Sequence, residues 1–209
     1  MEFEEWEPLY MEILEEFGYS REEDERAARV LTSLVSGRRW CDPNCLRERI
    51  GGSATVCGNA PSLEVELDDR SPSGTILSAD GATKALMDRG FFPDLIVTDL
   101  DGDLDPQVEA NSRGAVAVIH AHGDNVERLR GHVPRFRGRI TPTTQSKPFD
   151  RVFNFGGFTD GDRAFLLARH FGAEVSLMGF DFEFPREGGE VGDLKRRKLQ
   201  WAKRLIHGP

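Results

Sequence analysis

The sequence predicts an α/β fold, a mostly parallel sheet with helices on both faces, preceded by a helical N-terminal layer. From residue 54 onwards, short apolar runs alternate with segments of helical periodicity, which is typical of strand–helix–strand units. The run at 95–97 is apolar at every position, as expected for a strand covered on both faces. We therefore predict a helical cap over 1–52 and an α/β domain over 53–209.

Two helices are predicted in the N-terminal part. The first has apolar side chains at helical spacing, at Trp6, Tyr10, Ile13, Leu14 and Phe17. Gly18 is placed to end this helix. Ser20, followed three residues later by Glu23, forms a capping-box pattern that predicts a second helix through Leu34.

The α/β part divides into predicted strands and helices. The strands are expected at 54–57, 75–79, 95–99, 115–120 and 174–178, with further candidates at 139–141 and 152–154. A helix start is expected near 58–63, and further helices at 82–89, 106–112, 125–130, 159–171 and 193–206.

Composition limits the classes of partner. The 209 residues include 27 basic and 36 acidic side chains, a formal net charge of −9. We expect no nucleic-acid partner, because nucleic acids recruit positive surface. Apolar stretches stay short of the roughly 20 residues of a membrane span, and the N-terminus lacks a secretory signal. We expect no membrane partner and a cytoplasmic location, while the choice between a monomer and a homodimer stays open.

The chain has three cysteines, Cys41, Cys45 and Cys57, an odd and small number that suits a reducing compartment. The spacing of Cys41 and Cys45 could supply half of a metal site, but no matching pair follows in the sequence. We therefore expect free or buried thiols.

Two aspartates, Asp99 and Asp101, follow the buried run at 95–97. If the strand ran on to Asp101, both carboxylates would face one side, with Cα atoms roughly 6.5–7 Å apart. Two carboxylates at this spacing can share one or two Mg²⁺ ions, and Gly102 then lets the chain turn away. The carboxyl ends of parallel strands are also where α/β proteins bind ligands.

Other strand ends carry polar residues that would converge on the same edge, namely Gly58-Asn59, Asp80-Gly81, His120, His122, Asp124 and Asp181. The junction at 58–62 could bind phosphate through free N–H groups, although an ordinary tight turn also explains it. His120 and His122 favour hydrogen bonds to phosphate or to metal-bound water over a zinc site.

Thr159 and Asp162 are explained by helix capping. Capping leaves unexplained the glycine-containing loop at 154–158 that precedes them, which could fold over a ligand.

The segment Asp-Leu-Asp-Gly at 99–102 first resembles the nucleophile loop of haloacid-dehalogenase-type phosphatases. In that family the motif usually opens the domain, whereas here at least two strand–helix units precede it. Asp103 also stands where that family has Thr or Val, and no convincing lysine motif follows.

A second resemblance covers much more of the chain. Ser-Ala-Asp-Gly-Ala at 78–82, the 93–101 segment and Thr-Asp-Gly-Asp-Arg-Ala at 159–164 follow the motif order of thiamine pyrophosphokinase catalytic domains. Gly102 replaces their usual Ser, and too few residues follow position 180 for their thiamine-binding domain. Together with the segments at 58–63 and 154–162, these departures make the chain resemble the archaeal 6-hydroxymethyl-7,8-dihydropterin diphosphokinase family.

The resemblance implies a fold like the thiamine pyrophosphokinase catalytic domain. It also implies transfer of diphosphate from ATP to the hydroxymethyl group of the dihydropterin, in methanopterin or folate-type cofactor synthesis. Mg²⁺ would be the cofactor, with ATP as co-substrate. The implied metal ligands are Asp99, Asp101, Asp80 and Asp160.

Further roles follow from the same resemblance. Asp124 or a histidine such as His122 would orient or deprotonate the hydroxyl group, and Phe155 or Phe158 would lie against the pterin. The residues implied at the nucleotide are Gly58, Asn59, Ser62, Asp160, Arg163 and Lys147. Alternatives that stay open are thiamine as acceptor, a related sugar-transfer protein, and a non-catalytic nucleotide-binding module.

Overall fold

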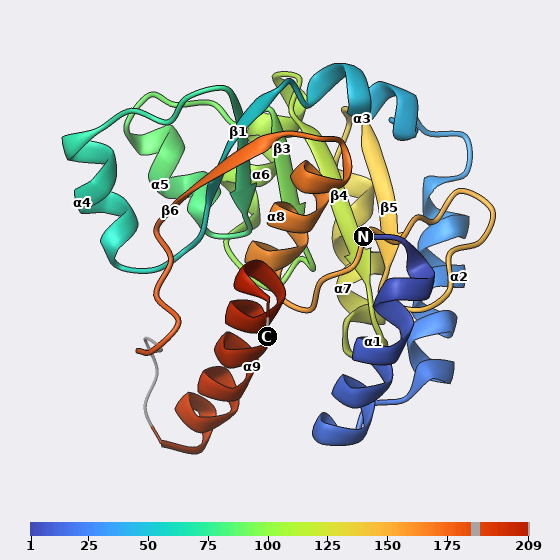
Figure 1. The fold of residues 1–209 in the computed structure, drawn as a ribbon. Helices are drawn as coiled ribbons and strands as arrows, with labels where there is room; N and C mark the ends of the chain where they lie inside the picture. The colour runs from blue at the N-terminus through green and yellow to red at the C-terminus, as the bar shows by residue number, and fades with distance from the viewer. Residues whose placement is uncertain (185–188, 209) are drawn as a thin grey trace.

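The computed structural model describes residues 1–184 and 189–208. At its centre lies a parallel sheet of six strands in the order β5-β4-β3-β2-β1-β6 (Figure 1). The predicted α/β class is therefore confirmed. The strands are β1 (Ser53–Cys57), β2 (Thr75–Ala79), β3 (Leu95–Thr98), β4 (Val116–Ala121), β5 (Ile140–Thr144) and β6 (Glu174–Met178).

Helices cover both faces of the sheet. The crossovers from β1 to β4 each contain a helix, in the order α4 (Ser62–Asp69), α5 (Ala82–Asp88) and α6 (Leu104–Ser112). After β4 come η1 (Gly123–Asn125), α7 (Val126–His132) and η2 (Val133–Arg135). The crossover from β5 to β6 runs back across the sheet and contains α8 (Asp160–His170). Because such crossovers are right-handed, α8 lies on the face opposite α4–α7.

Alternation along the strands divides the core into two layers. Val116 and Val118 of β4 belong to an apolar cluster with α8, whereas Ala117 and Ile119 belong to a second cluster with α7. Successive side chains of a strand point to opposite faces, so each strand supplies both layers. The same holds for the apolar run predicted as a doubly covered strand, since Leu95 and Val97 belong to the cluster with α8 and Ile96 to one with Ala110 of α6.

The N-terminal helices are α1 (Phe3–Phe17), α2 (Arg21–Val35) and α3 (Pro43–Arg49). Gly18 ends α1 in the left-handed region (φ 68°), and the Ser20 side chain accepts the Glu23 N–H, as predicted. The sequence did not predict α3. Helix α2 packs on β4, β5 and α7, so the helical layer is part of the sheet's covering. The division at 52/53 stays a prediction.

Helix α9 (Gly189–His207) packs against α1, and in Figure 1 the two helices extend from the same end of the sheet. Trp201 of α9 and Trp6 of α1 share an apolar cluster. Arg204 pairs with Glu12 at 2.7 Å, and the Trp201 indole N–H donates to Glu16 at 2.7 Å. These contacts join α1 and α9, which lie far apart in the sequence.

Several predicted boundaries differ from the structure. Strand β3 ends at Thr98, before Asp99, because Leu100 takes a left-handed conformation (φ 69°) that an extended strand cannot contain. The predicted strand at 152–154 is wrong: Val152 and Phe153 form only isolated bridges. There the chain turns back on itself through Asp150 (φ 50°), with Phe149 and Val152 exchanging backbone hydrogen bonds.

The expectation of free thiols is wrong for Cys41 and Cys45, which form a disulfide. Asp42 caps α3 by accepting the Cys45 N–H at 2.8 Å, and this first turn brings the two cysteine Cα atoms to 5.2 Å. That separation lies within the range that a disulfide requires. Cys57 is free, and burial raises the pKa of its thiol to about 12.

In the part of the chain that the structure describes, no helix combines the length and apolar character needed to cross a membrane.

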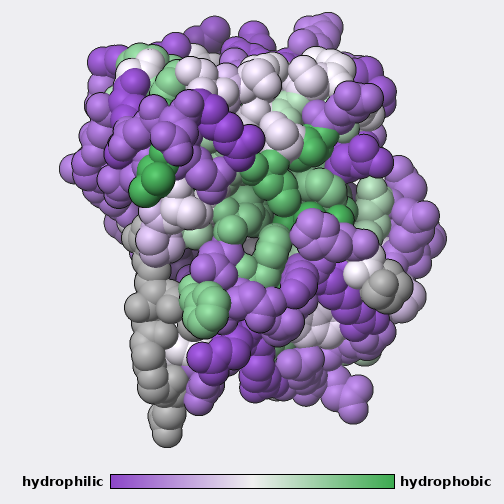
Figure 2. Space-filling view, turned by 60° about the vertical axis from the view of Figure 1, so that its left-hand side comes forward, coloured by the Kyte–Doolittle hydropathy of each residue, from purple (hydrophilic) through white to green (hydrophobic). Residues whose placement is uncertain are grey.

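Strand β6 lies at an edge of the sheet. Figure 2 brings that side forward and shows a hydrophobic area within a mostly hydrophilic surface.

Candidate active site

Three aspartates meet beyond the carboxyl edge of the sheet. Asp80 follows β2, Asp101 follows β3 and Asp160 opens α8, and each offers a carboxylate oxygen within 4.8 Å of the others. We call these residues the acidic triad. Carboxylate oxygens gathered in this way are the ligands that hard divalent cations take in proteins, so the triad could hold a metal ion.

Burial and mutual repulsion raise the pKa values of the triad. Asp101 is solvent-exposed by surface area, yet partial desolvation, followed by the charges of Asp99 and Asp80, raises its pKa to about 6. Burial and the charge of Asp99 raise the pKa of Asp160 well above its ordinary value, and burial also raises that of Asp80. A cation among the three carboxylates would relieve this repulsion, so the donor set fits a metal ion.

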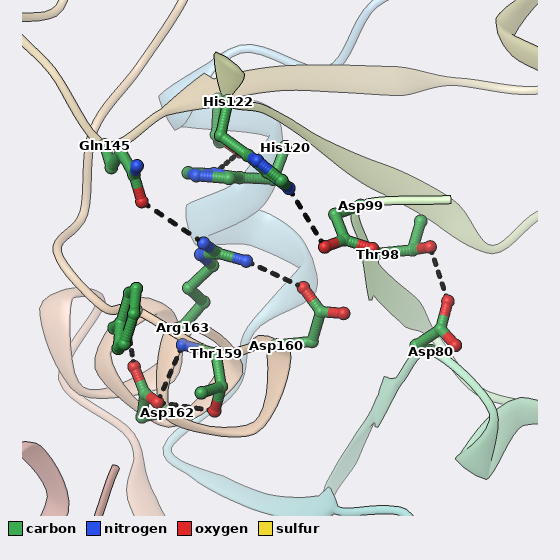
Figure 3. A network of polar contacts seen from close by, with 12 residues as sticks. Asp80, Thr98, Asp99, His120, His122, Gln145, Thr159, Asp160, Asp162 and Arg163 are labelled. Carbon is green, nitrogen blue, oxygen red and sulfur yellow. Dashed lines mark hydrogen bonds and ion pairs between the residues drawn. The ribbon is translucent and has the colours of Figure 1, made fainter. Parts of the chain in front are cut away.

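Asp80 is held in place by side chains from two elements. Thr98 at the end of β3 donates to Asp80 Oδ1 at 2.8 Å (Figure 3). Gln107 of α6 donates to the same oxygen, also at 2.8 Å. The other oxygen, Oδ2, lies over Gly102, where a Cβ atom would stand only 1.9 Å away. A Ser at position 102, the usual residue of the thiamine pyrophosphokinase motif, would displace Asp80. The presence of Gly102 in its place thus has a steric explanation.

Asp99 is hydrogen-bonded to a histidine and is not a member of the triad. Its Oδ2 hydrogen-bonds to His122 Nε2 at 3.1 Å, while among the described residues its buried Oδ1 has no partner. Burial opposes ionisation of Asp99, but the His122 hydrogen bond and the Arg163 charge outweigh it, so its pKa is below the ordinary value. Because β3 ends early, Asp99 and Asp101 do not alternate along a strand. A metal-binding role for Asp99 stays a prediction.

Arg163 of α8 connects the triad to the other side of the site. This side chain is 7% exposed, and its Nη1 donates to Asp160 Oδ1 at 3.0 Å (Figure 3). Its Nη2 lies 3.5 Å from Gln145 Oε1. The loop before α8 packs on this arginine, since a Cβ at Gly157 (φ 103°) would lie 2.6 Å from Arg163 Cγ.

Thr159 and Asp162 form the predicted capping box of α8. Asp162 Oδ2 accepts from Thr159 N at 2.9 Å and from Thr159 Oγ1 at 2.6 Å, and Oδ1 accepts from Phe158 N at 2.5 Å. The capping interpretation is confirmed. Asp162 is fully buried and lies outside the triad, whereas Asp160, two residues earlier, belongs to it.

A pocket opens beside Asp99, between α2, η1 and α9. We call it the α2 pocket. It is lined at the sheet edge by Asp99, His122 and Arg163, and further out by Glu23, Phe158 and Lys198.

The remaining predicted residues are spread around this centre. Asp124 is exposed in η1 and lines the α2 pocket. Asn59 lies against Gly81, the residue that follows Asp80. A Cβ atom at Gly81 would lie 2.4 Å from Asn59 Nδ2. Ser62 is exposed at the start of α4. Lys147 is exposed after β5 and is not among the residues that line the pocket.

The close approach of two strand ends explains Gly58. A Cβ there would lie 2.6 Å from the carbonyl oxygen of Gly179, which follows β6.

Of the two phenylalanines proposed to contact the pterin, Phe158 lines the α2 pocket. Phe155 instead packs in the core beneath α8. His120 is buried and hydrogen-bonds to Thr143 through Nδ1 at 3.1 Å.

Sequence reasoning missed Asp24, which is 2% exposed. Its carboxylate accepts hydrogen bonds from Tyr10 Oη at 2.6 Å, from Gly123 N at 2.8 Å and from Gln145 Nε2 at 2.8 Å. Asp24 therefore links α1, η1 and Gln145, whose side chain also lies near Arg163. One signal was present in the sequence, since Asp24 falls on the helix face that also carries the apolar residues 27, 28 and 31.

Comparison with known proteins gives consistent matches. A family model described as 6-hydroxymethylpterin diphosphokinase MptE-like matches residues 42–187. A 6-hydroxymethyl-7,8-dihydropterin pyrophosphokinase of Pyrococcus furiosus is 43% identical, over 99% of this chain and 93% of that protein. Proteins of the same name from Methanocaldococcus jannaschii and Methanothermobacter thermautotrophicus are 35% and 40% identical, over 99% of this chain and 95% and 94% of theirs.

Among solved structures, the chain is similar to the MAf glycosyltransferase from Magnetospirillum magneticum AMB-1. The TM-score is 0.52 at 16% identity, over 89% of this chain and 34% of that one. The chain therefore spans about a third of that structure, and at this identity the likeness concerns the fold alone.

Proposed function

Because the chain belongs to the 6-hydroxymethylpterin diphosphokinase MptE-like family, we propose that it transfers diphosphate from ATP to 6-hydroxymethyl-7,8-dihydropterin. This is the activity of a 2-amino-4-hydroxy-6-hydroxymethyldihydropteridine diphosphokinase, in methanopterin or folate-type cofactor synthesis. The hydroxymethyl oxygen bonds to the β-phosphorus, and the bond from that phosphorus to the oxygen shared with the α-phosphate breaks. AMP leaves, and the hydroxyl proton passes to a base.

The acidic triad is the observation that carries this proposal, because it places metal-binding carboxylates at the ligand-binding edge of the sheet. Asp80, Asp101 and Asp160 would hold Mg²⁺, and the unpartnered oxygen of Asp99 makes that residue a further candidate ligand. Bound there, Mg²⁺ would neutralise the charge that builds on the non-bridging oxygens of the β-phosphate.

His122 is our candidate for the residue that orients or accepts the hydroxyl proton. Its Nε2 is held by Asp99, and both residues line the α2 pocket, so the pair stands where the acceptor would meet the triad. Asp124, exposed in the same loop, is the alternative. Arg163 would neutralise phosphate charge from the opposite side, as a buried guanidinium already placed beside Asp160.

The nucleotide and the pterin would lie on opposite sides of the triad. Gly58, Asn59 and Ser62 would border ATP, because Asn59 lies against Gly81, the residue that follows Asp80. The pterin would lie against Phe158, whose ring lines the α2 pocket. Lys147 keeps the phosphate role that the family resemblance implies, from an exposed position after β5.

Product analysis tests this function. The chain is incubated with ATP, Mg²⁺ and the dihydropterin, and nucleotides are separated by chromatography. We expect AMP and the pterin diphosphate in equal amounts, and no such product with thiamine or a nucleotide-sugar. ADP or free phosphate as the nucleotide-derived product would contradict diphosphate transfer. Binding of ATP without cleavage would favour the non-catalytic module.

A further inference from the structure

The α2 pocket has more acidic than basic side chains. Asp99, Glu23, Asp24 and Asp124 line it, against Arg163 and Lys198. A polyphosphate would be repelled by this wall, because like charges in a partly buried site interact strongly. A neutral ring with hydrogen-bond donors along one edge would be attracted. The pocket therefore suits the acceptor better than the nucleotide.

Two of these carboxylates are already engaged by the protein. Asp24 accepts three hydrogen bonds, and Asp99 is paired with His122. Glu23 differs from these two, because it is solvent-exposed and, within residues 1–184 and 189–208, its carboxylate has no hydrogen bond and no ion pair, as is also true of Asp124. Glu23 is thus available to accept hydrogen bonds from a ligand in the pocket.

Close packing of α2 on η1 fixes the position of Glu23. A Cβ at Gly123 would lie 2.8 Å from Glu23 Cβ and 3.4 Å from its Oε2, so the carboxylate lies directly over this loop. The neighbouring Asp24 accepts the Gly123 N–H, which keeps helix and loop together. Glu23 is therefore held at a set distance from His122, the residue before Gly123.

Aromatic rings form a second wall. The rings of Tyr19 and Phe158 lie with their centroids 6.4 Å apart, and both residues line the pocket. Lys198 Nζ lies 5.8 Å from the first ring and 5.6 Å from the second. A planar heterocycle can pack against such rings with one end toward His122 and the other toward Glu23.

We propose that Glu23 selects the pterin ring, an inference that rests on the proposed function. Its carboxylate accepts hydrogen bonds from the 2-amino group and the N3–H of the pterin, while the hydroxymethyl group points toward His122. Two parallel N–H donors match the two oxygens of a carboxylate, as in guanidinium–carboxylate pairs. A ring without these donors would leave the carboxylate desolvated and unpaired, which is how polar sites reject analogues.

Steady-state kinetics of Glu23→Gln tests the assignment. We expect KM for the dihydropterin to rise roughly 10- to 100-fold, as for loss of a charge-assisted hydrogen-bond pair, with KM for ATP unchanged and kcat within about threefold. Glu22→Gln is the matched control, because Glu22 is the exposed preceding residue and does not line the pocket. An unchanged KM for the dihydropterin in Glu23→Gln would overturn the proposal.

An acceptor analogue tests the ring edge itself. 6-Hydroxymethyl-7,8-dihydrolumazine has a carbonyl oxygen in place of the 2-amino group. The wild-type chain should prefer the pterin, and Glu23→Gln should reduce this preference at least tenfold, because glutamine can donate to that carbonyl. The same preference in both chains would overturn the assignment.

Direct binding separates this inference from the proposed function. Binding of 6-hydroxymethylpterin without ATP is followed by its fluorescence in wild type, Glu23→Gln and Glu22→Gln. If the wild-type chain formed no AMP, the proposed function would fail, yet weaker binding to Glu23→Gln alone would still support the pocket assignment. Equal affinity in all three chains would overturn it whatever the reaction.

Discussion

Gly102 illustrates how a single residue fixes the geometry of the acidic triad. Its missing side chain leaves room for Asp80 Oδ2, while Thr98 and Gln107 hold the other oxygen. Asp80 (φ 43°) and Leu100 (φ 69°), in the two loops that carry triad residues, take left-handed conformations. Non-glycine residues rarely adopt such conformations, and strain of this kind concentrates at functional sites.

Gly102→Ala should weaken metal binding at least tenfold, which corresponds to about 1.4 kcal/mol. The new methyl group would occupy the space of Asp80 Oδ2 and push one ligand out of the triad. Gly102 is exposed, so the far-UV circular dichroism spectrum should stay unchanged. Isothermal titration with Mn²⁺ measures the affinity. Equal Mn²⁺ affinity in both chains would show that Asp80 is not a ligand.

Among the helices and strands, α8 contributes charged residues directly to the site. Its first turn carries Asp160 and Arg163, and its capping box orients that turn through Asp162. Helix α2 positions the other side of the site, because Asp24 accepts hydrogen bonds from η1 and from Gln145. The position of the charged groups thus depends on two helix starts that lie far apart in the sequence.

Asp162→Ala should destabilise the fold by roughly 2–3 kcal/mol. The change removes a cap and leaves the buried N–H groups of Phe158 and Thr159 without their acceptor. Urea unfolding followed by circular dichroism measures the loss in free energy of unfolding. Asp193→Ala, at an exposed position of α9, is the control and should change stability by less than about 0.5 kcal/mol. Equal losses for the two variants would contradict the capping role.

The sequence was informative where the structure depends on local signals. Strand ends, helix caps and the convergence of Asp80 and Asp101 follow from periodicity and from the parallel order of the strands, whereas Asp160 was indicated only by the family resemblance. Features that depend on tertiary contacts were missed. Asp24 gains its partners only when α2 docks on η1, and the end of β3 at Thr98 depends on the turn at Leu100.

For the whole molecule, the triad couples stability to pH and to metal. The pKa of Asp101 is about 6 in the fold, against an ordinary 3.8, so the folded state binds this proton more tightly than the unfolded chain. Without metal, the contribution of Asp101 to the free energy of unfolding therefore falls as pH rises from about 4 to 6 and stays lower above that range. Asp80 and Asp160 shift in the same direction.

Asp101→Asn should accordingly raise the melting temperature of the metal-free protein by a few degrees at pH 7.5, with little difference from wild type at pH 4. Removing one negative charge relieves the repulsion that wild type carries above pH 6. Saturating Mg²⁺ should stabilise wild type and reduce or reverse the difference. Thermal melts in EDTA and in Mg²⁺ measure this. Parallel pH profiles of the two chains in EDTA would contradict it.

In our proposal, the acidic triad holds the metal ion used in diphosphate transfer. Mn²⁺ binding, followed by electron paramagnetic resonance with the ion as a substitute for Mg²⁺, tests it most directly. We predict one tight site in wild type, a loss of at least tenfold in affinity in Asp101→Asn, and unchanged affinity in Asp103→Asn. Asp103 is the neighbouring exposed carboxylate that caps α6 outside the triad. Equal Mn²⁺ affinity in all three chains would contradict the claim.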